Sequence, residues 1–199
     1  MSSFFGHSLA AYSLASAARY QQEPSSPRFV WAGWLIVLAS APDADYLIPG
    51  LNSRAHHGLR ITHSVAFSLV LPLCTAVALC LTSRDGRKLR SLSVCAALAG
   101  LSHLVLDFFV GVTPLPLLWP FSAATFASPA GVLPSAGRVQ LSNYYFYRNL
   151  VIEMGVLAPV LYVARGVYCG TIGGQNRARI IVLLTIAGCF IAWSLSLSR

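Results

Sequence analysis

A small set of polar side chains in this apolar chain is of the kind that binds metal ions. His103 and Asp107 stand four residues apart in "HLVLD", so on a helix they share one face. Asp43 and Asp45 occur together in "PDAD", and His63 lies in "THS" just before a long apolar run. Ionisable residues in apolar segments are costly and usually functional. Imidazole and carboxylate ligands without thiolates suit Zn²⁺, Mn²⁺ or Fe, whereas Mg²⁺ prefers oxygen ligands.

The candidate ligands outnumber the positions of one tetrahedral site. We therefore expect a cluster of two or three ions, in which an aspartate of "PDAD" bridges metals or orients a water molecule. Such clusters activate water and stabilise in-line displacement at phosphorus. Arg60 or Arg54 would balance the charge of a phosphate. The predicted metal ligands are His7, Asp43, Asp45, His57, His63, His103 and Asp107, and the predicted catalytic residues are Asp43, Asp45 and Arg60.

Simpler roles compete with these assignments. His56 and His57 are adjacent, so only one of them needs to face the site, and the sequence does not decide which. Arg60 equally suits anchoring to lipid headgroups, and "PDAD" is also a turn sequence. Glu153 either pairs with Arg148 or joins the site.

The composition indicates a membrane protein. Of the 199 residues, 56% are hydrophobic and only 10% are charged, whereas about 25% are charged in soluble domains. The net charge of +8 is not gathered on a basic helix face or in an aromatic RNA-binding motif, which argues against a nucleic-acid partner. The positive residues flank apolar runs instead, where they suit orientation signals and anionic headgroups. The five cysteines fall in or beside apolar runs without a CxxC pair, so we interpret them as small hydrophobic residues.

Apolar runs define the elements that must position these residues. A transmembrane helix needs about 20 apolar residues, and we predict an all-α, polytopic membrane helix bundle of about four to six membrane helices. It forms a single integral membrane domain over 1–199, in which 1–120 carries the metal site. Thr62 is expected to cap the helix that follows it. The clear spans are 63–82, 91–112 and 178–197, with a shorter one at 149–165 and marginal segments at 29–42 and 4–20.

Two basic turns set the expected orientation. Residues 83–90 and 165–179 are rich in Lys and Arg, and the positive-inside rule places both on the cytoplasmic side. His103 lies about 18 Å along the helix over 91–112, so it approaches the opposite side. His63 opens the preceding span at that same side. The ligands converge at one depth, and we expect a metal site at the outer membrane-water interface.

The motifs, taken in order, resemble the YdjM-like inner-membrane proteins, a family described as membrane-bound metal-dependent hydrolases. The family pattern is matched by His7, "PDAD", "HHGLRITHS", "HLVLD" and "PLLWP" at 116–120, so the resemblance covers 7–120. One departure is the position of Arg60, which stands after the glycine of its motif rather than before it. The resemblance implies a location in the bacterial inner membrane.

The family is in turn distantly similar to zinc-dependent bacterial phospholipase C, an all-helical enzyme with a zinc cluster. This similarity implies zinc as the ion, with ligands from one aspartate of "PDAD" and from His7, His63, His103 and Asp107. We therefore predict a membrane-bound metal-dependent hydrolase that uses metal-activated water to cleave a phosphoester of a lipid or lipid-linked substrate. The alternatives are a non-enzymatic metal carrier or sensor, and a structural membrane protein in which these side chains only pack helices.

Overall fold

The computed structural model of the protein describes residues 3–18, 28–46, 48, 59–111, 113–129, 131–135, 142–172 and 176–197. In this part of the chain the fold is all-helical, which confirms the predicted class, and Leu115 and Phe126 form an isolated β-bridge. Two short 3-10 helices, η2 (Ala41–Tyr46) and η3 (Ile61–His63), lie between α2 and α4. The α-helices are α1 (Phe4–Ala17), α2 (Arg28–Ser40), α4 (Val65–Thr82), α5 (Gly86–Val110), α6 (Tyr144–Tyr168) and α7 (Arg177–Ser196).

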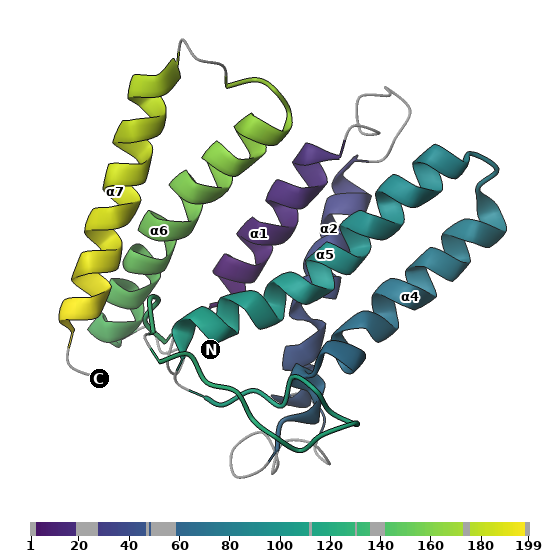
Figure 1. Ribbon diagram of the computed structural model, residues 1–199, viewed down its shortest axis with the longest axis horizontal. Helices are drawn as coiled ribbons and strands as arrows, with labels where there is room; N and C mark the ends of the chain where they lie inside the picture. The colour runs from purple at the N-terminus through teal and green to yellow at the C-terminus, as the bar shows by residue number, and fades with distance from the viewer. Residues whose placement is uncertain are drawn as a thin grey trace.

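Successive helices run in opposite directions through the bundle (Figure 1). α1 lies centrally and packs against α2, α5 and α6, while α4 packs on α5 and α7 packs on α6. The last turns of α4 and α6 and the first turns of α5 and α7 all lie towards the top of Figure 1, and Lys and Arg residues lie on these turns of α5, α6 and α7. Because η2 follows α2 and η3 precedes α4, both 3-10 helices lie at the opposite end.

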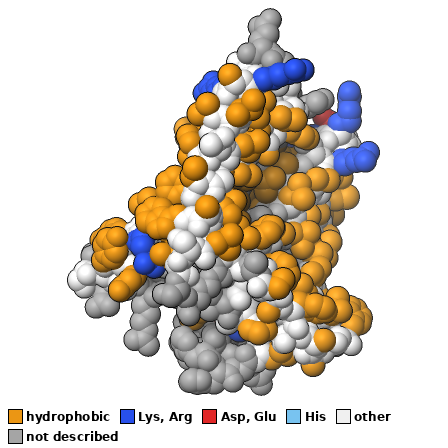
Figure 2. All heavy atoms as spheres, turned by 60° about the vertical axis from the view of Figure 1, so that its left-hand side comes forward, with side chains coloured by type: hydrophobic (Ala, Val, Ile, Leu, Met, Phe, Trp, Pro, Cys, Tyr) orange, Lys and Arg blue, Asp and Glu red, His pale blue; other side chains and the backbone are white. Residues whose placement is uncertain are grey.

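Among the described residues, α4, α5, α6 and α7 are the helices long and apolar enough to cross a membrane. α1 has 14 residues and α2 has 13, which gives lengths of about 21 and 20 Å. Both are shorter than the roughly 30 Å of a hydrocarbon core. The marginal segments 4–20 and 29–42 therefore form short helices rather than full spans. Figure 2 shows a largely hydrophobic flank, with most of the visible Lys and Arg side chains towards its upper end.

Small side chains allow α1 to occupy the centre of the bundle. Ala11 and Ala15 are fully buried in one cluster with Leu35 and Leu38 of α2 and Ala99 of α5. Small residues let the backbones of membrane helices approach closely. This packing brings the first turns of α1, which carry a predicted ligand, close to α5.

Capping side chains begin α4 and α5 at positions that differ from the prediction. The Oγ of Ser64 accepts an N–H of the first turn of α4, so Ser64 caps this helix and Thr62 does not. Asp85 accepts two N–H groups of the first turn of α5, so α5 begins at Gly86. The predicted basic turn at 83–90 is therefore shorter, and its second half is helical.

α6 is longer than the predicted span at 149–165. Asn143 caps it by accepting a hydrogen bond from the N–H of Tyr145. With 25 residues the helix is long enough to cross the membrane. Its tyrosine-rich first turn lacks the apolar pattern of a span, which is why the sequence placed the start too late.

The contact between α4 and α5 requires a glycine. A methyl group added at Gly100 would overlap the backbone carbonyl of Ser68 and the ring of Pro72. Both groups belong to α4 and neither is the flexible end of a side chain. Gly100 therefore sets the distance between the two helices about one turn before His103.

We predict that Gly100→Ala lowers the free energy of unfolding by about 1–3 kcal/mol, the usual cost of overpacking. The matched change Gly188→Ala in α7 meets nothing nearby and should be neutral or stabilising by up to about 1 kcal/mol. Thermal unfolding of both variants in one detergent measures the difference. Equal stabilities would contradict the close approach of α4 and α5.

Candidate metal centre

Side chains from four elements meet at the end of the bundle opposite the basic turns of α5, α6 and α7. His7 projects from the first turns of α1, Asp43 from η2 and His63 from η3. His103 and Asp107 lie on the last third of α5. The three histidines are fully buried, and Asp107 is 3% exposed. The structure thus gathers His7 and residues from "PDAD", "HHGLRITHS" and "HLVLD", whereas "PLLWP" at 116–120 supplies no potential ligand to the cluster.

Two imidazole nitrogens lie at distances from each other and from two carboxylates that are suited to a metal ion. His63 Nε2 is 3.2 Å from His103 Nε2 and 3.4 Å from Asp107 Oδ2. Asp43 Oδ1 is 3.5 Å from His63 Nε2 and 3.7 Å from His103 Nε2. The distance from His103 Nε2 to Asp107 Oδ2 is also 3.7 Å. Tetrahedral zinc with bonds of about 2.0–2.1 Å places its ligand atoms about 3.3 Å apart, so these residues fit such an ion with small adjustments.

A second group of potential ligands shares the α5 pair with His7. His7 Nε2 lies 3.8 Å from Asp107 Oδ1, the other oxygen of the same carboxylate. The rings of His7 and His103 are stacked, with centroids 4.0 Å apart and an interplanar angle of 11°. Potential ligand atoms of His7, His103 and Asp107 all lie within 4.8 Å of one another, as do those of Asp43, His63 and His103. Asp107 is therefore placed to bridge two ions, a role that the sequence reading gave to "PDAD".

Hydrogen bonds orient two of the histidines. His103 Nδ1 is 2.7 Å from the carbonyl oxygen of Ala39, so we assign the ring proton to Nδ1. His63 Nδ1 is 3.0 Å from Thr62 Oγ1, whose hydroxyl donates to Asp45 Oδ2 at 3.1 Å. In both rings Nε2 then faces the other potential ligands. Partners of this kind fix the tautomer and orientation of metal-binding imidazoles.

Asp45 and Arg60 form a buried ion pair beside the histidines. Arg60 donates to the two oxygens of Asp45 through Nε and Nη2, both at 2.9 Å, and its Nη2 is 3.3 Å from Asp43 Oδ1. Asp45 belongs to neither of the ligand groups that the described residues form. The two-point contact favours a role in holding η2 against η3. Direct contact of Asp45 with a metal, and of Arg60 with a phosphate, stay predictions.

The cluster contains more negative than positive charge. Asp43, Asp45 and Asp107 contribute three carboxylates, and Arg60 pairs with two of them. The imidazoles are neutral unless they bind a proton. Buried charge is costly unless it is paired or coordinates a metal. A divalent cation among the histidines would offset the excess negative charge.

Asp43 forms the open side of the cluster. Its side chain is 28% exposed, whereas that of Asp107 is 1% exposed. Burial alone would raise the pKa of Asp43, but the hydrogen bond with His63 and the nearby His103 together hold the pKa below its ordinary value. Asp43 is therefore ionised at neutral pH, which is the form that binds a metal. A small molecule would reach the cluster from this side.

Some predicted residues are not placed, and some contributors were not predicted. His57, its alternative His56, and Arg54 lie outside the described residues. Thr62 was predicted only as a helix cap, although its position next to a histidine could have indicated a supporting hydrogen bond. The sequence contains no pattern that predicts the bond between the carbonyl of Ala39 and His103, because a backbone group can be recognised as a partner only once the helices are packed.

Glu153 contacts the beginning of α1. The sequence analysis offered a pair with Arg148 as one alternative, and the structure does not form this pair. The carboxylate of Glu153 accepts hydrogen bonds from the backbone N–H of Ser3, at 2.9 and 3.1 Å, while Arg148 binds a neighbouring side chain on α6. A methyl group on Gly6 would overlap this carboxylate, so α6 and the start of α1 are in close contact. Negative charge at a helix N-terminus is favourable. Glu153 thereby fixes the turn from which His7 projects.

Comparison with known proteins identifies the family. A model of the YdjM inner membrane protein family matches residues 1–198, so the chain belongs to this family. The match extends well beyond 7–120, the part over which the motifs resemble the family. No curated protein and no solved structure matches the chain. The similarity to phospholipase C stays a prediction.

We predict that Thr62→Val weakens zinc binding by about 10–100-fold, the usual effect of losing a partner that orients a ligand. Thr82→Val is the matched control, because the hydroxyl of Thr82 bonds to the backbone of its own helix at the far end of α4. Titration of metal-free protein with zinc, followed by calorimetry, gives both affinities. Equal affinities would show that Thr62 does not support a metal site.

We predict that Glu153→Ala lowers the free energy of unfolding by roughly 1–3 kcal/mol, because the buried N–H of Ser3 loses its acceptor. It should also weaken zinc binding, since the position of His7 depends on this contact. Asp85→Ala removes the cap of α5 at the far end and costs about 0.5–2 kcal/mol of stability, but it should leave zinc affinity unchanged. The same zinc affinity in both variants would contradict the link between Glu153 and the site.

Proposed function

We propose that this member of the YdjM inner membrane protein family is a membrane-bound metal-dependent hydrolase that cleaves a phosphoester of a lipid or lipid-linked substrate. The observation that carries the proposal is that Nε2 of His63 and Nε2 of His103 lie 3.2 Å apart and that an oxygen of Asp43 and an oxygen of Asp107 each lie 3.4–3.7 Å from both of these nitrogens. The side chain of Asp43 is 28% exposed, so we infer that a substrate would approach from this side. Histidine and carboxylate ligands with an open side are typical of hydrolytic zinc sites.

A divalent ion held here would activate water and polarise a phosphoryl oxygen. The chain's own residues supply the positioning. His63 and His103 direct Nε2 inwards, because their Nδ1 atoms are bonded to Thr62 and to the carbonyl of Ala39. Asp43 lies at the exposed side of the cluster, where its ionised carboxylate would help to hold the ion and, through its second oxygen, would orient the attacking water. Zinc suits this donor set best, although Mn²⁺ or Fe would also bind.

The place of the cluster in the bundle supports a lipid substrate. His63 lies two residues before the first residue of α4, and Asp107 lies three residues before the last residue of α5. Both helices are long and apolar enough to cross a membrane, so their ends lie near the headgroups. The basic first turns of α5 and α7 and the basic last turn of α6 lie at the other end, and on the positive-inside rule we infer that the cluster faces the non-cytoplasmic side. A phosphoester in that headgroup layer would reach Asp43 without leaving the membrane.

Arg60 would adjust the charge that such a phosphate meets. Its guanidinium is buried, holds Asp45 at two points and lies 4.8 Å from the ring centroid of Tyr46. We infer that Arg60 keeps this pair during turnover and reduces the negative potential at the exposed side of the cluster. This supporting role differs from the direct phosphate contact that the sequence reading expected.

We predict that Asp43→Asn lowers kcat/KM for a lipid phosphoester by at least about 100-fold, the upper range for weakened metal sites. The zinc-loaded protein in mixed micelles would be assayed for release of phosphate or phosphorylated headgroup from phosphatidic acid, phosphatidylglycerol and a polyisoprenyl phosphate. Asp85→Asn, which changes an exposed acid at the far end of α5, is the control and should retain activity.

The outcomes separate the proposal from its alternatives. Zinc binding without turnover of any substrate class would contradict the hydrolase and support a metal carrier or sensor. Failure to bind metal, with unchanged stability in His63→Ala, would support a purely structural role. Turnover that survives in Asp43→Asn would place the chemistry elsewhere.

A further inference from the structure

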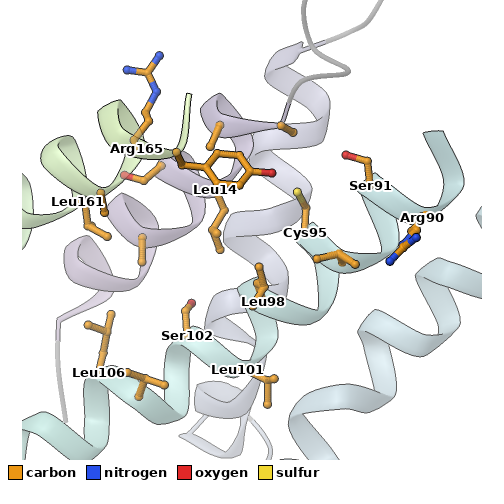
Figure 3. Close-up of a pocket in the computed structure, with 18 of the residues that line it drawn as sticks. Leu14, Arg90, Ser91, Cys95, Leu98, Leu101, Ser102, Leu106, Leu161 and Arg165 are labelled. Carbon is orange, nitrogen blue, oxygen red and sulfur yellow. The ribbon is translucent and has the colours of Figure 1, made fainter. Parts of the chain in front are cut away.

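An apolar groove of about 830 Å³ lies between α1, α5 and α6, and none of the predicted metal ligands lines it. Leu14 of α1, Leu98, Leu101 and Leu106 of α5 and Leu161 of α6 form its walls (Figure 3). The groove is open because α1 presents alanine and serine side chains towards it where larger residues would fill the space. Its walls have the chemistry of a site for a hydrocarbon chain.

Arginines line the same groove at its basic end. Arg87 and Arg90 belong to the first turns of α5, and Arg165 belongs to the last turn of α6. Figure 3 shows Arg90 and Arg165 on different helices on either side of the groove. A neighbouring cavity of about 640 Å³ is also lined by Arg165 and adds Arg28 and Tyr12. Positive charge beside an apolar channel is complementary to an anionic headgroup that carries an acyl chain.

The length of the groove fits one leaflet of a bilayer. Its apolar wall on α5 extends from Val94 to Leu106, a rise of about 18 Å. The hydrocarbon core of a bilayer is roughly 30 Å thick, so one leaflet covers about half of that. An acyl chain with its headgroup near the arginines would therefore lie against protein over the depth of its own leaflet.

We propose that this groove binds an anionic phospholipid of the leaflet on the basic side of the protein, with its headgroup at the end that the arginines line and an acyl chain along the leucines. This lipid is distinct from the proposed substrate, because its headgroup lies at the opposite end of the bundle from the histidines. The proposal does not depend on the metal site or on hydrolysis.

Retention of phosphatidylglycerol against phosphatidylcholine tests the headgroup contact. The delipidated full chain would be incubated with each lipid in detergent, and the bound lipid measured by native mass spectrometry. Each arginine near an anionic headgroup contributes roughly fivefold in affinity, so Arg90→Gln with Arg165→Gln should weaken phosphatidylglycerol binding roughly 25-fold. The control, Arg84→Gln with Arg177→Gln, removes equal charge at the same end but outside the groove, and should have little effect.

A variant that fills the groove tests the acyl-chain contact without changing charge. Leu98→Trp should reduce phosphatidylglycerol retention, because Leu98 lines the groove and is 45% exposed. Val77→Trp on the exposed face of α4 adds the same bulk outside the groove and should not reduce it. Thermal unfolding of each variant separates loss of lipid from loss of fold.

Three results would overturn the proposal. Equal retention of the two lipids would show that the headgroup charge is not recognised. If the two double-arginine variants lost equal amounts of bound phosphatidylglycerol, the lipid would be attracted by the general surface charge and not by a site in the groove. Full retention in Leu98→Trp, or in the Arg90 and Arg165 variant, would place the lipid elsewhere, including at the metal-binding end. None of these readouts depends on hydrolysis, so each can fail while the proposed function stands.

Discussion

The enclosure of imidazoles and carboxylates by an apolar helix bundle is the constraint on which the rest of the structure depends. Asp107 and three histidines are almost completely buried, and the carboxylates of the cluster exceed the single guanidinium that pairs with them. Such a group is stable in a medium of low dielectric constant only when its charge is compensated. A cation site requires donor atoms close to one another and partners that orient the imidazoles. The cluster has both, because Thr62 and the carbonyl of Ala39 are bonded to the histidines.

The two short helices explain how a polar cluster can form at the end of a membrane bundle. α1 and α2 are too short to cross a hydrocarbon core, and η2 follows directly after α2. Glu153 of α6 holds the start of α1 at the same level. The short helices therefore bring His7 and Asp43 to the depth of the α5 pair. At the other end the small residues of α1 leave the apolar groove that the arginines border.

Much of the fold could be predicted, and so could the proximity of His7, Asp43, His63, His103 and Asp107, because both depend on local patterns. Apolar runs located the long helices, and the spacing of His103 and Asp107 placed them on one face. Counting residues along helices that cross the membrane in alternating directions also predicted that His63 lies at the same depth as this pair. Features that need three-dimensional packing could not be predicted: the pairing of Asp45 with Arg60, the contact of Glu153 with Ser3, and the carbonyl of Ala39 beside a histidine. The true start of α6 was missed because its first turn is aromatic rather than uniformly apolar.

The measurement that tests the central claim most directly is X-ray absorption spectroscopy at the zinc edge of the purified, zinc-loaded protein. Nitrogen and oxygen ligands at about 2.0–2.1 Å, with the outer-shell scattering of imidazole, are expected for a site of histidines and aspartates. Sulfur scattering at about 2.3 Å would instead assign the metal to cysteines. That result, or a protein that takes up no metal at all, would contradict the account.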